Sequence, residues 1–591
     1  MKQVVLGVFL GLFLALVLGV LAVVGLVKLA ASGEEAMPAK TLLVLDWEGL
    51  LPGHRIDATQ ADFNTPVTLS HVLEALQEAA TREEIQGILI DRPLDVPREY
   101  LMELQEALAA FRKSGKPIYA HLDMAVAGAY MAACLADSVA LSPARSGGVL
   151  LTGPNVSLLY MGEALQRLGI KVNVLHQGEA KGFGEQYAQQ EMSPPVRENL
   201  GRLVEDLLLS DLEWISRSRG VDQKALRAEL ENPGRLWITP AEALEMGLAD
   251  TLLSRSDWDE FIKVRFPDAE RLSLKSWIHS RSTFTGLTQE GPALENHVAV
   301  LWAEGEILPG GGDKTQVAIA ARDMVEEIRQ LAEADAVQAV VLRVESPGGS
   351  ALASEEIYQE LVKLAKRKPL WVSAGPVAAS GGYYLSVPGA PIFATPYSVV
   401  GSIGVVALVP DVSQGARKLG LNPQSISSLP AGRLLNLGEP VDPAMLASLN
   451  RNMAGIYEEF RARVLAHRPL SPQALDPIAA GRVWAGGRAR DLGLVDCLGG
   501  LGACVDSLQL TLGGTPLPIH HYPRQLNLME LLLSGNLRPW DLLPAGKLER
   551  AAALVGVPSL LRAVEEDPRR LQDPRWMLRA EAPILEGALA R

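Results

Sequence analysis

Ser380 is the residue whose surroundings most clearly suggest chemistry. It lies in the stretch VAASGGYYLSV, residues 377–387, between two alanines and two glycines. Such a setting is typical of a tight turn from a strand into a helix that exposes a nucleophilic hydroxyl, although ordinary turns and helix N-caps also use Ser-Gly. A serine attacks only when a base takes its proton, and this stretch contains no histidine or lysine. A base must therefore come from elsewhere in the chain.

Two copies of one pattern follow each other along the sequence. TLLVLDWEGLLPG from Thr41 parallels VAVLWAEGEILPG from Val298, and GRLWITPAEALEMGLAD from Gly234 parallels GRVWAGGRARDLGLVD from Gly481. The segments between these pairs match in the same order. A fixed order of matches at a nearly constant spacing indicates a duplicated domain.

The copies differ at the residues that could do chemistry. Where the second copy has Ser380, the first has Ala127 or Gly128, depending on where a gap is placed. The first copy instead has Lys181 in EAKGFGEQY, where the second has Arg433 or its neighbours. A lysine can lose its proton when buried, whereas arginine stays charged. We therefore expect one site, between the copies, with the base from one and the nucleophile from the other.

A second loop differs in the same sense. The second copy reads ESPGG at residues 345–349, where the first reads DRPLD at residues 91–95. Glycines after a proline leave backbone N–H groups unobstructed, as an oxyanion hole requires. The second copy is therefore expected to supply the oxyanion donors, with the Glu345 side chain pointing away from them.

The histidines offer an alternative base. A Ser/His/Asp arrangement could use His121 or, better, His176, which lies five residues before Lys181. The remaining histidines are scattered, and adjacent His520 and His521 would point to opposite faces of a strand. This pattern favours neither a metal site nor a cofactor. Tyr383 and Tyr384 are expected to pack in the helix after Ser380.

The elements that must position these residues follow a βα pattern. Short apolar runs alternate with amphipathic helices; after the run AVVLRV, for example, Ile357, Leu361 and Leu364 mark one helical face. Such alternation predicts right-handed βα crossovers and a mostly parallel sheet in each copy, an α/β fold.

The length of 591 residues fits several domains. We expect a transmembrane anchor (1–31), a first repeat (41–278), a linker (279–297), a second repeat (298–512) and a helical C-terminal extension (513–591).

The anchor is expected because residues 4–27 carry no charge and would span about 36 Å as a helix. The few flanking charges favour an inside amino terminus and place the bulk of the chain outside. A net charge of −14 argues against a nucleic-acid partner. The three cysteines fit neither a disulfide framework nor a zinc site. Cys497 and Cys504 could pair in an oxidising compartment, but separate thiols are expected.

Several motifs together resemble a known family. RVESPGGS, GPVAASGGYY, VGSIGVV and EAKGFGEQY are similar to the long, duplicated form of the signal peptide peptidase A family, bacterial membrane-anchored proteases of peptidase family S49. The resemblance runs along nearly the whole chain and implies a Clp-protease and crotonase-like fold with a split Ser/Lys dyad. It implies these roles: Ser380 as nucleophile, Lys181 as general base, Ser402 as the serine that orients the lysine, and Gly381 with Gly348 or Gly349 as oxyanion donors. Related sequences usually have asparagine where this one has Glu345.

The resemblance also implies a setting and a substrate class. These are hydrophobic signal or leader peptides as substrates, a homotetramer, and a bacterial inner membrane location with the catalytic domains on the periplasmic side. No cofactor is implied. Two other classes stay open: a catalytically idle membrane scaffold, and a crotonase-type enzyme acting on acyl-coenzyme A. The anchor and the Ser/Lys pairing argue against the second.

Overall fold

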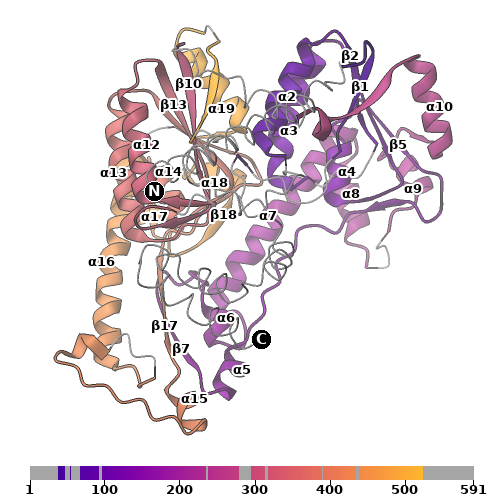
Figure 1. Ribbon diagram of the computed structural model, residues 1–591. Coiled ribbons are helices and arrows are strands. Elements are labelled where there is room, and N and C mark those ends of the chain that lie inside the picture. Colours follow the sequence, from indigo (N-terminus) through magenta and orange to yellow (C-terminus); the bar gives the residue numbers. More distant parts are fainter. Residues whose placement is uncertain are drawn as a thin grey trace, which may run out of the picture. The chain divides into compact units, whose positions relative to one another are not determined.

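The computed structural model describes residues 37–46, 53–54, 67–91, 96–233, 237–278, 295–312, 317–388, 391–433, 438–514 and 516–523 (Figure 1). All of them belong to one compact unit, Met1–Arg524, whereas the second unit, Gln525–Arg591, lies outside the described residues. The expected anchor at 1–31, most of the linker and most of the C-terminal extension also lie outside them.

The first copy is built on a six-stranded parallel sheet with the strand order β8-β5-β3-β2-β1-β9. The strands of the first copy, inside and outside this sheet, are β1 (Thr41–Val44), β2 (Ile85–Ile90), β3 (Ile118–Leu122), β4 (Met124–Val126), β5 (Ser138–Leu141), β6 (Gly148–Leu150), β7 (Lys171–Gln177), β8 (Thr251–Leu252) and β9 (Glu270–Ser273). Strand β4 pairs with β6, and β7 pairs with β17 (Val405–Asp411) of the second copy. Its helices are α2 (Leu69–Thr81), η2 (Arg98–Tyr100), α3 (Leu101–Arg112), α4 (Ala127–Ala133), α5 (Gly162–Arg167), α6 (Glu185–Ala188), α7 (Pro194–Arg219), α8 (Gln223–Leu230), α9 (Pro240–Glu245) and α10 (Arg255–Arg265).

The second copy repeats this order in a sheet that includes β19-β15-β14-β13-β10-β20, extended beside β14 by β16 and β18. Its strands are β10 (His297–Glu304), β11 (Glu306–Leu308), β12 (Ala318–Ala320), β13 (Val337–Ser346), β14 (Leu370–Ala379), β15 (Ile392–Ala394), β16 (Val399–Gly401), β17 (Val405–Asp411), β18 (Val483–Ala485), β19 (Cys497–Leu498) and β20 (Ile519–Tyr522). Its helices are α12 (Ala321–Glu333), α13 (Ala351–Ala365), α14 (Gly381–Ser386), α15 (Ser413–Lys418), η3 (Pro430–Arg433), α16 (Pro443–His467), α17 (Pro472–Leu475), α18 (Gly486–Asp491) and α19 (Leu501–Thr511).

The matching strand orders confirm the α/β class and the internal duplication. Strand β20 pairs in parallel with β10, as β9 pairs with β1. The second sheet therefore reaches past residue 512, into the segment that we expected to form the C-terminal extension. His520 and His521 do lie on this strand, but its sequence IHHY has little apolar periodicity that would assign it to the sheet.

The sheets are covered on both faces, as expected for parallel strands. All eight residues of β10 are buried. Helix α13 begins after Ser350, whose side chain accepts the N–H of Ala353, and turns Ile357, Leu361 and Leu364 into the core. The apolar spacing in the sequence thus correctly predicted this helical face.

An antiparallel ribbon joins the copies below the sheets, where β7 of the first lies beside β17 of the second (Figure 1). Seven residue pairs form the ribbon, from Val405 opposite Gln177 to Asp411 opposite Lys171. Strands from different copies therefore share backbone hydrogen bonds, which fixes the register of one copy against the other.

Other features bear on location and chemistry. Among the described residues, which exclude 4–27, no helix is both long and apolar enough to cross a membrane. Cys134, Cys497 and Cys504 are free thiols, and Cys504 is buried. Within the same described ranges, no three His, Cys, Asp or Glu side chains gather as a metal site would require.

Candidate active site

Ser380 lies at the turn between β14 and α14, as the sequence predicts. Its backbone has φ 53° and ψ −120°, a strained region for a residue with a side chain, at a cost of order 1–3 kcal/mol. The turn is held on both sides: Ser380 N–H donates to the Gly401 carbonyl at 2.8 Å, and Tyr384 N–H donates to the Ser380 carbonyl at 2.9 Å. The surrounding structure thus stabilises a strained conformation that projects the hydroxyl.

The same turn in the first copy carries Ala127. Tyr383 after Ser380 donates its hydroxyl to the Leu494 carbonyl at 2.8 Å, and Tyr130 donates to the Leu248 carbonyl at 2.7 Å. Since these tyrosines make equivalent contacts three residues beyond the turn, Ala127 and not Gly128 is the counterpart of Ser380. The first copy has no hydroxyl at this position.

Ser402 lies beside Ser380 because of strand register. Strands β14 and β16 pair in parallel with Ala379 opposite Gly401, so the residue after each strand is one of the two serines. Ser402 also has φ 53°. Its N–H donates to the Arg482 carbonyl at 2.6 Å, next to β18.

The ribbon brings Lys181 to these serines. Gln177 at the end of β7 pairs with Val405 at the start of β17, so the loop after β7 runs alongside Ser402. Ala180 N–H donates to the Ala480 carbonyl at 2.9 Å. A Cβ on Gly481 (φ +79°) would lie 2.5 Å from the Lys181 backbone nitrogen, so only glycine fits against this loop.

The Lys181 amine lies in contact with both serines. Its Nζ is 3.0 Å from Ser380 Oγ, 2.9 Å from Ser402 Oγ and 2.9 Å from the Ser402 carbonyl. The side chain is buried, at 5% exposure. Burial without a nearby carboxylate lowers the pKa of Lys181 from 10.5 to about 8. The structure thus places together the serine, the lysine and the second serine that the sequence singled out.

Three glycines line the approach to Ser380. Gly348 packs so closely that a Cβ there would lie 2.8 Å from Ser380 Cβ, and a Cβ on Gly349 would lie 2.2 Å from the Ile307 carbonyl oxygen. Gly348 N–H donates to Ser346 Oγ at 3.1 Å. Within the described part of the chain, the N–H groups of Gly349 and Gly381 have no hydrogen-bond acceptor. These two donors are free to bind an oxyanion.

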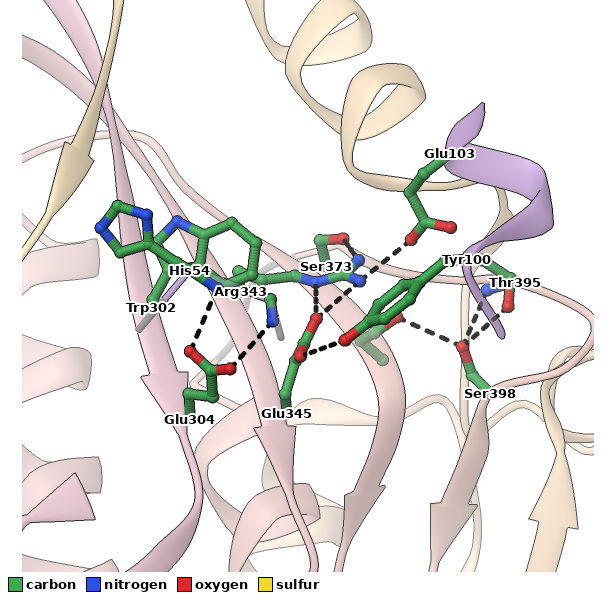
Figure 2. A network of polar contacts seen from close by, with 12 residues as sticks. His54, Tyr100, Glu103, Trp302, Glu304, Arg343, Glu345, Ser373, Thr395 and Ser398 are labelled. Carbon is green, nitrogen blue, oxygen red and sulfur yellow. Dashed lines mark hydrogen bonds and ion pairs between the residues drawn. The ribbon is translucent and has the colours of Figure 1, made fainter. Parts of the chain in front are cut away.

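Glu345 points away from the glycines, as expected. Its Oε1 accepts Arg343 Nε at 2.9 Å and its Oε2 accepts the Tyr100 hydroxyl at 2.9 Å (Figure 2). Its counterpart loop in the first copy, at 92–95, lies outside the described residues.

The alternative bases lie elsewhere. His176 is exposed and contacts the Gly178 carbonyl through Nδ1. His121 is buried, contacts the Leu253 carbonyl and stacks on Trp258. Among the described residues, neither ring is hydrogen bonded to Ser380.

The remaining residues of interest have structural surroundings. Tyr383 and Tyr384 are buried in α14, as predicted, and the Tyr384 hydroxyl binds Glu355. Arg433 lies in η3, and its side chain is outside the described residues. Sequence reasoning missed Gly481 and Arg343. Gly481 could have been found because the motif Gly-Arg-x-Trp occurs in both copies, from Gly234 and from Gly481. Arg343 could have been found because it is a charged residue inside the apolar run AVVLRV.

Comparisons with known proteins identify the family of this chain. The model of Peptidase family S49 matches residues 110–310 and 362–513, which include Lys181, Ser380 and Ser402. Protease 4 of Salmonella typhi is 28% identical over 487 residues, covering 78% of this chain and 76% of that protein. The chloroplastic serine protease SPPA of Arabidopsis thaliana is 28% identical over 465 residues, covering 77% and 67%. Protease 4 of Haemophilus influenzae is 28% identical over 520 residues, covering 83% and 82%. Since the matched segments make up more than half of the sequence, the chain belongs to peptidase family S49.

Proposed function

We propose that this S49 protease is a serine endopeptidase in which Ser380 is the nucleophile and Lys181 the general base. The observation that carries the proposal is the 3.0 Å contact between Lys181 Nζ and Ser380 Oγ inside a buried site. A buried lysine with a pKa of about 8 is neutral in a substantial fraction of molecules near neutral pH, as a base must be.

The contacts of the amine suggest how it is oriented. A neutral amine has two N–H groups and one lone pair. If the N–H groups donate to the carbonyl and hydroxyl of Ser402, each 2.9 Å away, the lone pair faces Ser380 Oγ. Ser402 is thus a positioning residue for the base.

The reaction then follows ordinary acyl transfer. As Ser380 Oγ bonds to the peptide carbonyl carbon, its proton moves to Lys181, and the resulting oxyanion binds the N–H groups of Gly381 and Gly349. The C–N bond breaks as Lys181 returns the proton to the leaving amine, which leaves an acyl ester on Ser380. Lys181 next deprotonates a water that attacks the ester, and the serine is restored.

Hydrophobic peptides, such as remnants of signal peptides, are the proposed substrates. Exposed apolar side chains flank the candidate residues: Phe183, 58% exposed, follows Lys181 by two positions, and Leu352, 67% exposed, follows Gly349 by three. The uncharged run at 4–27 would anchor the chain in a bacterial inner membrane, with the protease on the periplasmic side. Membrane lipid is then a further partner. The crotonase-like fold implied by the resemblance belongs to the same proposal.

The homotetramer implied by the family resemblance is part of the proposal, and the ribbon suggests one way in which chains could join. In sequence, the counterparts of β7 and β17 are residues 422–428 of the second copy and 152–158 of the first. Both segments are largely exposed, and neither forms a strand. A neighbouring chain could supply the missing partner for each, which would repeat the β7–β17 junction between chains.

The test compares Ser380→Ala and Lys181→Ala with the wild-type chain. Each substitution should abolish cleavage of an apolar peptide while the thermal unfolding transition is retained. A fluorophosphonate should label the wild-type protein at Ser380, as mapped by mass spectrometry. Full activity in either variant refutes the dyad. Absence of labelling would favour the idle scaffold or the acyl-coenzyme A enzyme.

A further inference from the structure

Four acidic or hydroxyl-bearing side chains surround one buried arginine at the junction of the two copies (Figure 2). Arg343 on β13 is completely buried. Its guanidinium lies 2.9 Å from Glu103 Oε1 of α3 and 2.8 Å from Glu345 Oε1, and its Nη1 donates to Ser373 Oγ at 2.9 Å. We name Glu103, Tyr100, Arg343 and Glu345 the junction cluster.

The junction cluster spans the two copies. Tyr100 and Glu103 belong to η2 and α3 of the first copy, whereas Arg343 and Glu345 lie on β13 of the second. Alternation along a strand puts Arg343 and Glu345 on one face and Ser346 on the other. A buried charge without a partner strongly destabilises the folded state. The buried guanidinium of Arg343 therefore needs at least one of its two carboxylate partners, Glu103 of the first copy or Glu345 of the second.

Glu345 is next to both halves of the proposed site. Strand β13 ends at Ser346 and continues directly into Pro347, Gly348 and Gly349. On the other side, the β13–β14 register shifts between Val344 and Ser346, so β14 bulges opposite Glu345. A Cβ on Gly375 of that bulge would lie 2.4 Å from Glu345 Cγ. Glu345 therefore fills the bulge in the strand that leads to Ser380.

Both oxygens of Glu345 are held. Oε1 accepts from Arg343, and Oε2 accepts the hydroxyl of Tyr100, which is 5% exposed. Hydrogen bonds to a charged group are stronger than those between neutral groups, and in a buried place they allow little displacement. The side chain is thus fixed against the bulge of β14 by a residue from each copy.

We infer that Glu345 is a positioning residue for the oxyanion loop, and that Tyr100 of the first copy keeps it in place. This role rests on the proposed serine protease function. The first copy would then contribute twice, by supplying the base and by holding the oxyanion donors of the second copy in register with Ser380. Misplacement of such donors lowers kcat more than KM, because negative charge develops on this oxygen only after the substrate has bound.

The test uses single variants of the full chain. Glu345→Ala should lower kcat at least tenfold, and Tyr100→Phe, which removes one hydroxyl, severalfold, while KM stays within about twofold. Glu345→Gln keeps the shape and an acceptor for Arg343, so it should retain most of kcat. Tyr100→Phe keeps the test decisive if Glu345→Ala fails to fold.

Glu106→Gln is the matched control. Glu106 lies on the same helix α3 and also bridges the copies, because its carboxylate accepts the N–H groups of Gly500 and Ala503 at the start of α19. Among the described residues, its carboxylate forms no hydrogen bond or ion pair with β13, although it lies near enough to feel the charge of Arg343. The Glu106→Gln variant should weaken the packing of α3 against α19 without lowering kcat.

Three results would overturn the role of Glu345. These are unchanged kcat in folded Glu345→Ala and Tyr100→Phe, an equal loss of kcat in Glu106→Gln, or a shift of the alkaline midpoint of the pH profile, which would mean that Lys181 had moved. If a fluorophosphonate fails to label Ser380 in the wild-type chain, the proposed function itself is wrong. Labelling with unchanged rates in the variants refutes the positioning role alone.

Discussion

Activity should depend on pH through the Lys181 amine. Burial lowers its pKa from 10.5 to about 8. At pH 7 a pKa of about 8 leaves roughly a tenth of the amines neutral, against about 0.03% for a solvated lysine, a gain of about 300-fold in available base. From pH 6 to pH 9 the neutral fraction rises about 90-fold, and it is nearly constant above.

The assay is kcat/KM for an internally quenched apolar peptide between pH 6 and pH 10. The fluorophosphonate labelling rate at Ser380 should follow the same curve, because it needs the same base. A midpoint between 6 and 7 would point to a histidine as the base, and a midpoint near 10.5 to a solvated lysine. Either result, or a flat profile, would refute the reasoning. The Lys181→Arg variant should show no rise of kcat/KM with pH, since arginine stays protonated.

The same shift has a consequence for stability. Since folding lowers the pKa of Lys181, the folded chain binds fewer protons than the unfolded one between pH 8 and pH 10.5. Stability from this group is present above pH 10.5, is lost as pH falls and is fully lost below pH 8, a change of about 3 kcal/mol. Lys181→Met should therefore be more stable than wild type at pH 7, with a difference that shrinks towards pH 10.5 in denaturant titrations.

Three further predictions follow from the site and its surroundings. Gly481→Ala should lower kcat about 100-fold by displacing Lys181, because its Cβ would lie 2.5 Å from the lysine nitrogen; a rate within twofold of wild type would contradict this. Ala127→Ser should not restore peptide cleavage to Ser380→Ala, since Lys181 contacts only the second-copy serines among the described residues; restored cleavage would mean that a second base exists. Arg343→Met should lower the free energy of unfolding in urea by about 3–5 kcal/mol, because it leaves two buried carboxylates unpaired; an unchanged midpoint would show that those carboxylates are neutral.

Comparison of the copies made the candidate pair predictable. The second copy has Ser380 but no lysine at the position that corresponds to Lys181, and the first copy has Lys181 but no serine at the position that corresponds to Ser380. The sequence therefore implied a site shared by the two copies. Their contact depends on β7 pairing with β17, which are not counterparts in the two copies. Apolar periodicity predicts that β7 and β17 are strands. It does not predict that they pair with each other, because β17 begins 234 residues after β7 in the sequence. The gap at Ala127 was settled only by the hydrogen bonds of Tyr130 and Tyr383.

Arg343 shows a different limit of sequence reasoning. In the run AVVLRV it looks like a polar interruption of a buried strand, and its burial depends on Glu103, which lies 240 residues earlier. Long-range charge pairing leaves no local pattern. The Glu345 side chain could be expected to avoid the glycines, but its partner Tyr100 could not be named.

The β7–β17 ribbon has a consequence for the timing of biosynthesis. Translation delivers Lys181 about 200 residues before Ser380, and the ribbon cannot close until β17 has left the ribosome. If the dyad is as proposed, every nascent chain first carries the base Lys181 without its nucleophile. It then briefly carries both Lys181 and Ser380 before the ribbon brings the two side chains into contact. The enzyme would therefore remain inert towards its own unfolded segments, and towards neighbouring nascent proteins, until its second half has folded.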